Sequence, residues 1–213
     1  HTPVEIKQLK PAIEAMKDKK AKPIVRVSAN RDDLICFALD VGAMGIVVPM
    51  INTREEAEAM VRACKYSPDG DRSHSGPRGE FGEAADYRSY LDMVNEELLI
   101  IPMIETRLAI DNIDEILSVP GVDAFIIGPY DLSASMGMPG EVSHPDVQDA
   151  ISRVCAAGLA HKKTGGLHVV EPDKDALYGL IDSGYRFMGY SLDTRILDAN
   201  CRQDLGEIRQ RHA

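Results

Sequence analysis

The sequence is constrained most by a regular alternation of short apolar segments with stretches of helical spacing. Each apolar segment is rich in β-branched residues, which predicts a strand, and the intervals between these segments predict helices. Because the strands carry few polar interruptions, we expect a parallel sheet that is covered by helices on its faces. The predicted strands are Pro23–Ser28, Gly45–Met50, Leu98–Glu105, Asp123–Gly128, Thr164–Val169 and Arg186–Ser191. The predicted helices are Pro11–Lys19, Asp32–Val41, Thr53–Lys65, Arg107–Ser118, Pro145–Ala157, Asp173–Ser183 and one that begins near Asp193.

Two architectures fit this alternation, an open doubly wound sheet and a closed (β/α)8 TIM barrel. An open nucleotide-binding sheet normally has a glycine-rich turn after its first strand, and this sequence has none there. A typical barrel has eight strands in about 250 residues. This chain has 213 residues and begins with His1. We therefore expect residues 1–213 to form a single α/β domain, a (β/α)8 barrel whose first one or two β-α elements lie upstream of this chain.

Charge and cysteine usage narrow the classes of partner. The chain has 34 acidic and 24 basic residues, a formal net charge of −10 that disfavours nucleic acid and anionic membranes as partners. No apolar run approaches the roughly 20 residues of a membrane span. The four cysteines form no C-x-x-C pair, which favours a reducing compartment. We expect a cytoplasmic protein that acts on a small molecule.

One long connection, residues 67–90, separates the helix Thr53–Lys65 from the strand that follows it. Loops of this length are uncommon unless they act as lids, binding loops or assembly contacts. Its basic residues include Arg72, His74, Arg78 and Arg88. Two interpretations remain open, an anion-contacting lid and a packing or subunit-interface segment.

Three charged residues stand at or just beyond the ends of predicted strands, where the active site of a TIM barrel forms. These are Arg26, Glu105 and Asp131. Since Glu105 and Asp131 follow consecutive strands, we expect two neighbouring carboxylates, which suit Mg²⁺ or Mn²⁺ and a 2-oxo acid that completes the coordination. The guanidinium of Arg26 suits the substrate carboxylate or a developing enolate oxygen. The alternative for each carboxylate is a helix cap.

Other enzyme classes are disfavoured. No serine lies in a nucleophile elbow, which argues against a serine hydrolase. No lysine lies within a predicted strand, which argues against a Schiff-base aldolase. His168 ends a predicted strand and either faces the site or has a structural role.

Three segments, Gly45–Val61, Pro102–Ile116 and Val119–Gly140, resemble the HpcH/HpaI aldolase family of class II 2-oxo-acid aldolases. The resemblance spans essentially the whole chain. It implies a (β/α)8 barrel that assembles as a trimer or hexamer, with a terminal helix exchanged between neighbouring subunits. It also implies reversible cleavage of a 4-hydroxy-2-oxo acid to pyruvate, or a close relative, and an aldehyde, with Mg²⁺, Mn²⁺ or Co²⁺.

The resemblance also implies roles for individual residues. Glu105 and Asp131 match the metal ligands, and Arg26 matches the arginine that steadies the enolate. His1 matches the histidine that acts as acid and base, and Asp40 matches the aspartate that raises its basicity. The implied substrate-binding residues are Arg26, Met103, Gly128, Tyr130 and Asp131, with the main-chain amide of Tyr130 in the carboxylate cradle.

The sequence departs from the family at positions around the implied site. Met103 replaces a glutamine that often contacts pyruvate, and a thioether donates no hydrogen bond. Tyr130 replaces the usual alanine before the metal aspartate and narrows the site. Residues 28–31 replace a P-W-N-D segment. We expect these changes to affect aldehyde preference more than chemistry at the enolate.

Three functions compete on the sequence. The leading interpretation is a metal-dependent pyruvate aldolase. A citrate-lyase-like or malyl-thioester lyase would keep the same site, but we find no basic extension for the phosphates of a thioester carrier. A non-catalytic homologue that only binds a ligand or assembles is the third, and the presence of Glu105, Asp131 and Arg26 argues against it.

Overall fold

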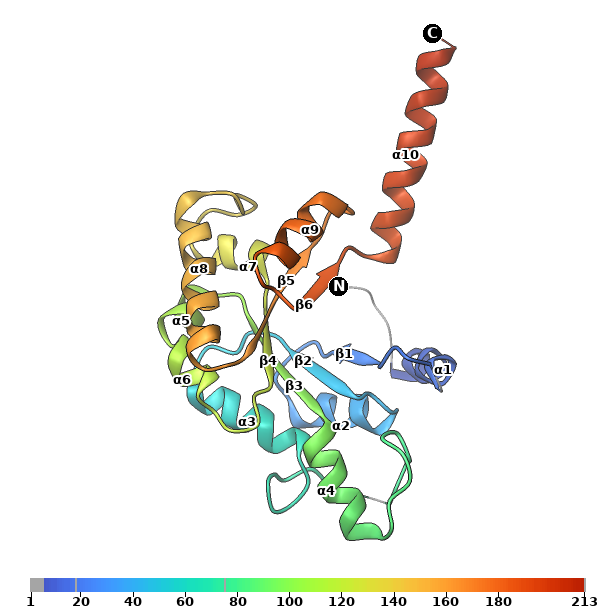
Figure 1. The fold of residues 1–213 in the computed structure, drawn as a ribbon, viewed down its shortest axis with the longest axis vertical. Helices are drawn as coiled ribbons and strands as arrows, with labels where there is room; N and C mark the ends of the chain where they lie inside the picture. The colour runs from blue at the N-terminus through green and yellow to red at the C-terminus, as the bar shows by residue number, and fades with distance from the viewer. Residues whose placement is uncertain (1–5, 18, 75, 213) are drawn as a thin grey trace.

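The computed structural model describes residues 6–17, 19–74 and 76–212. It contains a parallel six-stranded sheet in which neighbouring strands follow chain order from β1 to β6 (Figure 1). The strands are β1 (Ile24–Arg26), β2 (Gly45–Val48), β3 (Leu99–Ile104), β4 (Ala124–Ile127), β5 (Thr164–Val169) and β6 (Phe187–Tyr190). All six predicted strands are therefore present, and the α/β class is confirmed as a parallel half-barrel.

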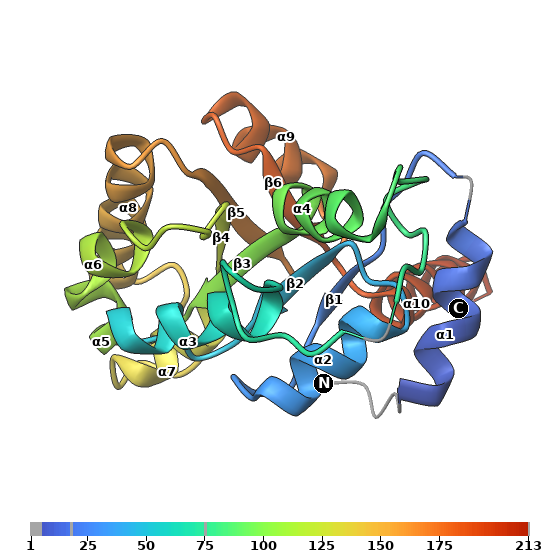
Figure 2. The same ribbon diagram turned by 90° about the horizontal axis from the view of Figure 1, so that it is seen from below.

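Helices connect the strands, and α2, α3, α6 and α8 follow one another along the outside of the curved sheet (Figure 2). The helices are α1 (Ile6–Met16), α2 (Asp32–Asp40), α3 (Arg54–Cys64), α4 (Tyr87–Glu97), α5 (Arg107–Asp111), α6 (Ile113–Leu117), α7 (Pro129–Ser135), α8 (Pro145–Ala160), α9 (Lys174–Asp182) and α10 (Asp193–Arg211). Within the described ranges, none combines the length and the apolar character needed to cross a membrane.

The helices differ from the predicted ones in four places. Helix α1 covers Ile6–Met16 rather than Pro11–Lys19, and α7 lies where no helix was predicted. The predicted helix Arg107–Ser118 is broken at Asn112, whose side-chain amide donates to the Asn52 carbonyl at 2.8 Å. Helix α4 begins at Tyr87, inside the segment expected to be a loop, where the Asp86 side chain accepts the Ser89 amide at 2.8 Å as an N-cap.

The two faces of the sheet carry different cores. The outer face, which includes Ile46, Ile100 and Phe125, packs with the helices in the main apolar cluster. A second cluster lies on the opposite face, hereafter the inner face, and comprises Val47, Ile101, Met103, Ala124 and Ile126, with Phe187 packed against it. Strands β2 to β4 are buried on both faces, whereas the residues of β6 are only half-buried. The residues that follow β2, β3 and β4 are therefore positioned by a well-packed part of the sheet.

The long connection lies at the amino ends of the strands, because α3 carries the chain back from the end of β2 before the connection begins. Arg72 is buried there and donates to Asp40 at 3.0 Å, with its guanidinium 4.5 Å from the centre of the Tyr66 ring. Arg78 also contacts Asp40, at 3.1 Å. These contacts support the packing interpretation of the connection rather than a lid.

Gly166 provides a test of how tightly the sheet is packed. A Cβ atom there would lie 2.5 Å from the Phe187 carbonyl oxygen and 2.9 Å from that of Phe125. We expect Gly166→Ala to lower the free energy of unfolding in urea by about 2 kcal/mol, because the neighbouring backbone cannot move aside cheaply. The control is Gly179→Ala in α9, where a Cβ meets nothing within 4 Å and a helical alanine should be neutral or stabilising. Equal effects of the two changes would contradict this packing.

Candidate active site at the carboxyl ends of the strands

Glu105 lies on the inner face directly after β3 and is only 2% exposed. The Met50 amide, at the end of β2, donates to its Oε1 at 2.9 Å. Met50 has a φ of 58°, a left-handed conformation that is uncommon for a residue other than glycine. The other carboxylate oxygen of Glu105, Oε2, is buried and has no hydrogen-bond partner among the described residues. A buried, unpartnered carboxylate oxygen is rare in proteins and calls for a ligand.

Gly128 makes space for this carboxylate. Its amide donates to the Ile104 carbonyl at 3.2 Å, which places Gly128 beside Glu105 at the carboxyl ends of β3 and β4. A Cβ atom at Gly128 would lie 2.7 Å from Glu105 Oε2 and 3.0 Å from Glu105 Cβ. Any side chain at this position would therefore displace the carboxylate, so the position requires glycine.

The charge of Glu105 is set by its burial and by two neighbours. Burial raises the pKa of Glu105, the Met50 amide lowers it, and the nearby charges of Asp131 and Arg26 raise and lower it, respectively. Asp131 is exposed in the first turn of α7, and Arg26 is the last residue of β1. The structure therefore brings Arg26, Glu105 and Asp131 together, as predicted from the strand ends.

This arrangement fits a divalent cation. A cation would neutralise two close carboxylates and supply the missing partner of Glu105 Oε2. No group of three or more His, Cys, Asp or Glu side chains placed to hold a metal occurs in the described part of the chain. The site thus offers two carboxylates and leaves the other positions to water and substrate, as Mg²⁺ sites commonly do.

A hydrogen-bond network holds the Met50 turn against the end of β3. The Asn52 side-chain amide donates to the Met50 carbonyl at 2.7 Å, and its Oδ1 accepts from the Thr106 hydroxyl. Thr106 follows Glu105 and caps α5 by accepting the Ala109 amide at 3.0 Å. The two backbone turns beside the carboxylate are therefore linked through Asn52, a residue that no sequence pattern singles out.

The other implied substrate-binding residues lie next to Glu105 and Asp131 in the chain. Met103 is buried on the inner face, two residues before Glu105. Tyr130 lies in the first turn of α7, and its side chain is 46% exposed. Its carbonyl accepts from the Ser133 hydroxyl at 2.8 Å.

The structure does not bring Asp40 together with these residues. Helix α2 runs back from the end of β1, so its last residue, Asp40, lies near the amino ends of the strands, where it pairs with Arg72 and Arg78. His1, its implied partner, lies outside the described residues. The catalytic role of this pair stays a prediction.

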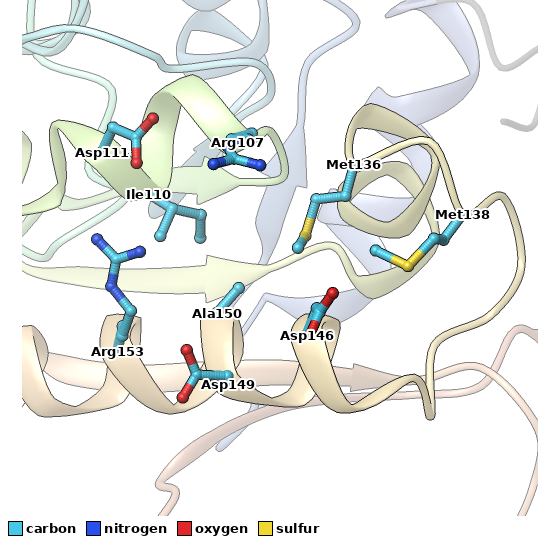
Figure 3. Close-up of a pocket in the computed structure, with 9 residues that line it drawn as sticks. All are labelled: Arg107, Ile110, Asp111, Met136, Met138, Asp146, Asp149, Ala150 and Arg153. Carbon is cyan, nitrogen blue, oxygen red and sulfur yellow. The ribbon is translucent and has the colours of Figure 1, made fainter.

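A cavity of about 360 Å³ lies between α5, α8 and the loop that follows α7 (Figure 3). Its lining combines charged side chains with two methionines: Arg107, Ile110, Asp111, Met136, Met138, Asp146, Asp149, Ala150 and Arg153. None of the residues selected from the sequence lines it. The candidate site is therefore the group formed by Arg26, Glu105 and Asp131, and not this cavity.

Comparison with known proteins identifies similar chains. The sequence model of the HpcH/HpaI aldolase/citrate lyase family matches residues 1–198. A hydroxypyruvate/pyruvate aldolase of Roseovarius nubinhibens is 32% identical over 213 residues, which cover 98% of this chain and 80% of that protein. A 5-keto-4-deoxy-D-glucarate aldolase of Salmonella arizonae is 38% identical over 169 residues, 78% of this chain and 65% of that protein. The crystal structure of an HpcH/HpaI aldolase/citrate lyase family protein from Burkholderia cenocepacia superposes with a TM-score of 0.88 at 33% identity, covering 98% of this chain and 82% of that one.

The stability of the metal-free protein tests the environment of Glu105. We expect Glu105→Gln to raise the free energy of unfolding at pH 7, in the presence of a chelator, by about 1 kcal/mol, the typical net size of one hydrogen bond. A glutamine oxygen can still accept the Met50 amide, and the side chain carries no buried charge. Glu115→Gln on α6, where the carboxylate is exposed, is the control.

The effect should depend on pH with a defined sign. Burial raises the pKa of Glu105 in the folded wild-type protein. Its free energy of unfolding therefore falls as the pH rises from the ordinary glutamate pKa through this raised pKa. The advantage of Glu105→Gln should therefore disappear at acidic pH, where the carboxyl is protonated in both states. A lower stability of Glu105→Gln at pH 7 would show that the carboxylate is already satisfied without a metal.

Proposed function

This chain belongs to the HpcH/HpaI aldolase/citrate lyase family, and from that premise we propose that it is a divalent-metal-dependent aldolase. It cleaves a 4-hydroxy-2-oxo acid reversibly to pyruvate, or a close relative, and an aldehyde. One observation carries the proposal: a buried carboxylate with an unpartnered oxygen, Glu105, lies beside a second carboxylate, Asp131, and within the field of Arg26.

Glu105 and Asp131 would hold the metal, which is Mg²⁺, Mn²⁺ or Co²⁺. When bound, such an ion polarises the keto group of a 2-oxo acid and stabilises negative charge on its oxygen. The Met50 amide keeps Glu105 Oε1 in place, so that Oε2 remains available to a ligand. Gly128 keeps the space beside it open.

Arg26 supplies the positive charge on the other side of the site. Its guanidinium is exposed on β1 and suits the substrate carboxylate or the oxygen that becomes negative during cleavage. The Tyr130 amide is the proposed second contact of the substrate carboxylate. His1 is the proposed acid and base. Asp40 is the proposed support of its basicity, although Arg72 and Arg78 bind the Asp40 carboxylate in this structure.

The proposal extends to the whole assembly. We propose an eight-stranded barrel, of which the described residues provide six strands, and a cytoplasmic location, which four free thiols support.

Helix α10 projects from the rest of the chain and contains no buried residue (Figure 1). Leu197, Leu205 and Ile208 are more than half exposed on it. Their spacing places them along one stripe of the helix, which supports a homo-oligomer, a trimer or hexamer, that buries this stripe.

Activity measurements test the metal ligands directly. We expect Glu105→Ala and Asp131→Ala each to lower metal-dependent pyruvate release by about 1,000-fold, because the ion supplies several kcal/mol of transition-state stabilisation. The assay couples pyruvate to lactate dehydrogenase across a panel of 4-hydroxy-2-oxo acids, with and without chelator. Glu115→Ala should keep the wild-type rate. Full activity of both site variants, or activity that chelator does not affect, would contradict the proposal.

Sedimentation velocity tests the role of α10. We expect the wild-type chain to sediment as an oligomer and the double variant Leu197→Glu, Leu205→Glu to sediment as a smaller species, because charges on the apolar stripe oppose its burial. Gln203→Glu, which adds a charge beside Glu207 on the polar side of the helix, is the control. A wild-type monomer at micromolar concentration would overturn this part of the proposal.

A further inference from the structure

A second polar group lies at the carboxyl ends of β5 and β6, formed by His168 and Ser191. Phe187 packs against the inner-face cluster and pairs with Gly166. His168, two residues further along β5, therefore lies on the same inner face, whereas Leu167 packs against the outer cluster. The strand register aligns His168 with Gly189 on β6 and, on the other side, with Gly128, since Leu167 pairs with Ile127. His168 thus shares with Glu105 one row across the carboxyl ends of the strands.

The imidazole is held at one nitrogen. A Cβ atom at Gly189 would lie 2.9 Å from His168 Cδ2, so the ring occupies the space that this glycine leaves. Its Nε2 lies 3.3 Å from the Ser191 carbonyl oxygen. Because a carbonyl only accepts, Nε2 is the donor, and in the neutral ring Nδ1 is then a hydrogen-bond acceptor.

Ser191 repeats the geometry found at Met50. It has a φ of 54°, and its amide donates to the Val169 carbonyl at 2.6 Å. Both residues follow a strand of the sheet in the left-handed conformation, and the backbone of each one binds a side chain of the inner row. Such strained residues persist where the surrounding structure holds them and are concentrated at functional sites.

The Ser191 hydroxyl adds an independent observation. Ser191 is 8% exposed, and its Oγ is buried without a hydrogen-bond partner among the described residues. A buried hydroxyl of this kind costs free energy unless water or a ligand satisfies it. Together with Nδ1 of His168, this hydroxyl provides a donor and an acceptor at the carboxyl ends of β5 and β6.

We propose that His168 and Ser191 bind the hydroxyl group of the aldehyde substrate, so that the enzyme prefers hydroxylated aldehydes to unsubstituted ones. The inference rests on the proposed aldolase function and assigns the substrate class to it. The backbones at Glu105 and His168 are separated by two strand spacings, about 10 Å. An aldehyde that reacts beside the carboxylates therefore reaches His168 with the carbons beyond its carbonyl. Arg26, at the end of β1, lies on the side of Glu105 that faces away from His168 in the strand order.

The test compares two aldehydes of nearly equal size, glycolaldehyde and propanal, as acceptors of pyruvate. We expect His168→Ala to lower kcat/KM for glycolaldehyde about tenfold and to change it less than about twofold for propanal, the effect of losing one hydrogen bond. Ser191→Ala should shift the same ratio in the same direction without loss of folding stability. His161→Ala, which removes a surface histidine paired with Asp114, should leave the ratio unchanged.

Deuterium exchange at the pyruvate methyl group separates this proposal from the proposed function, because exchange needs no aldehyde. Metal-dependent exchange in the wild type, with an unchanged aldehyde ratio in His168→Ala and Ser191→Ala, would overturn the role of His168 alone. Absence of exchange and of pyruvate release in the wild type would instead overturn the aldolase function. If His168→Ala does not fold, His168→Asn and Ser191→Ala decide the question through the same ratio.

Discussion

The structure depends on one contact, the hydrogen bond from the Met50 amide to the buried carboxylate of Glu105. This bond joins the end of β2 to the end of β3 and satisfies only one of the two carboxylate oxygens. Met50 makes this bond from a left-handed backbone conformation, and Asn52 links that turn to Thr106. The fold thus maintains a buried carboxylate that lacks one partner, an arrangement that a bound cation would satisfy and that lowers the stability of the metal-free protein.

Glycine and left-handed residues prepare the same edge of the sheet. Gly128 and Gly189 leave the space that Glu105 and His168 occupy, and Met50 and Ser191 turn backbone groups toward those side chains. The result is a row in which ionisable side chains alternate with glycines over β3 to β6. A row of this kind can bind a substrate along its length, with the carboxylates at one point and neutral hydrogen-bonding groups further along.

Much of the fold and the centre of the site could be predicted from the sequence, because burial on both faces leaves long apolar runs and a polar residue at the end of such a run is conspicuous. Glu105 and Asp131 could be selected from the sequence in this way. Met50 and Asn52 were not, because their importance arises from contacts with residues more than 50 positions away. Similarity placed Asp40 in the catalytic set, but the direction of α2 carries it to the other end of the strands. Helix α4 was not predicted, because it begins inside a long polar connection that lacks a clear helical pattern.

The central claim is that Glu105 and Asp131 form a metal site at the carboxyl ends of β3 and β4. Calorimetric titration of the chelator-treated protein with Mn²⁺ tests it most directly, since the measurement needs neither a substrate nor an assumption about the reaction. The account predicts one binding site per chain in the wild type and no measurable binding in either Glu105→Ala or Asp131→Ala, with both variants folded. Equal Mn²⁺ affinity in the wild type and both variants would contradict it.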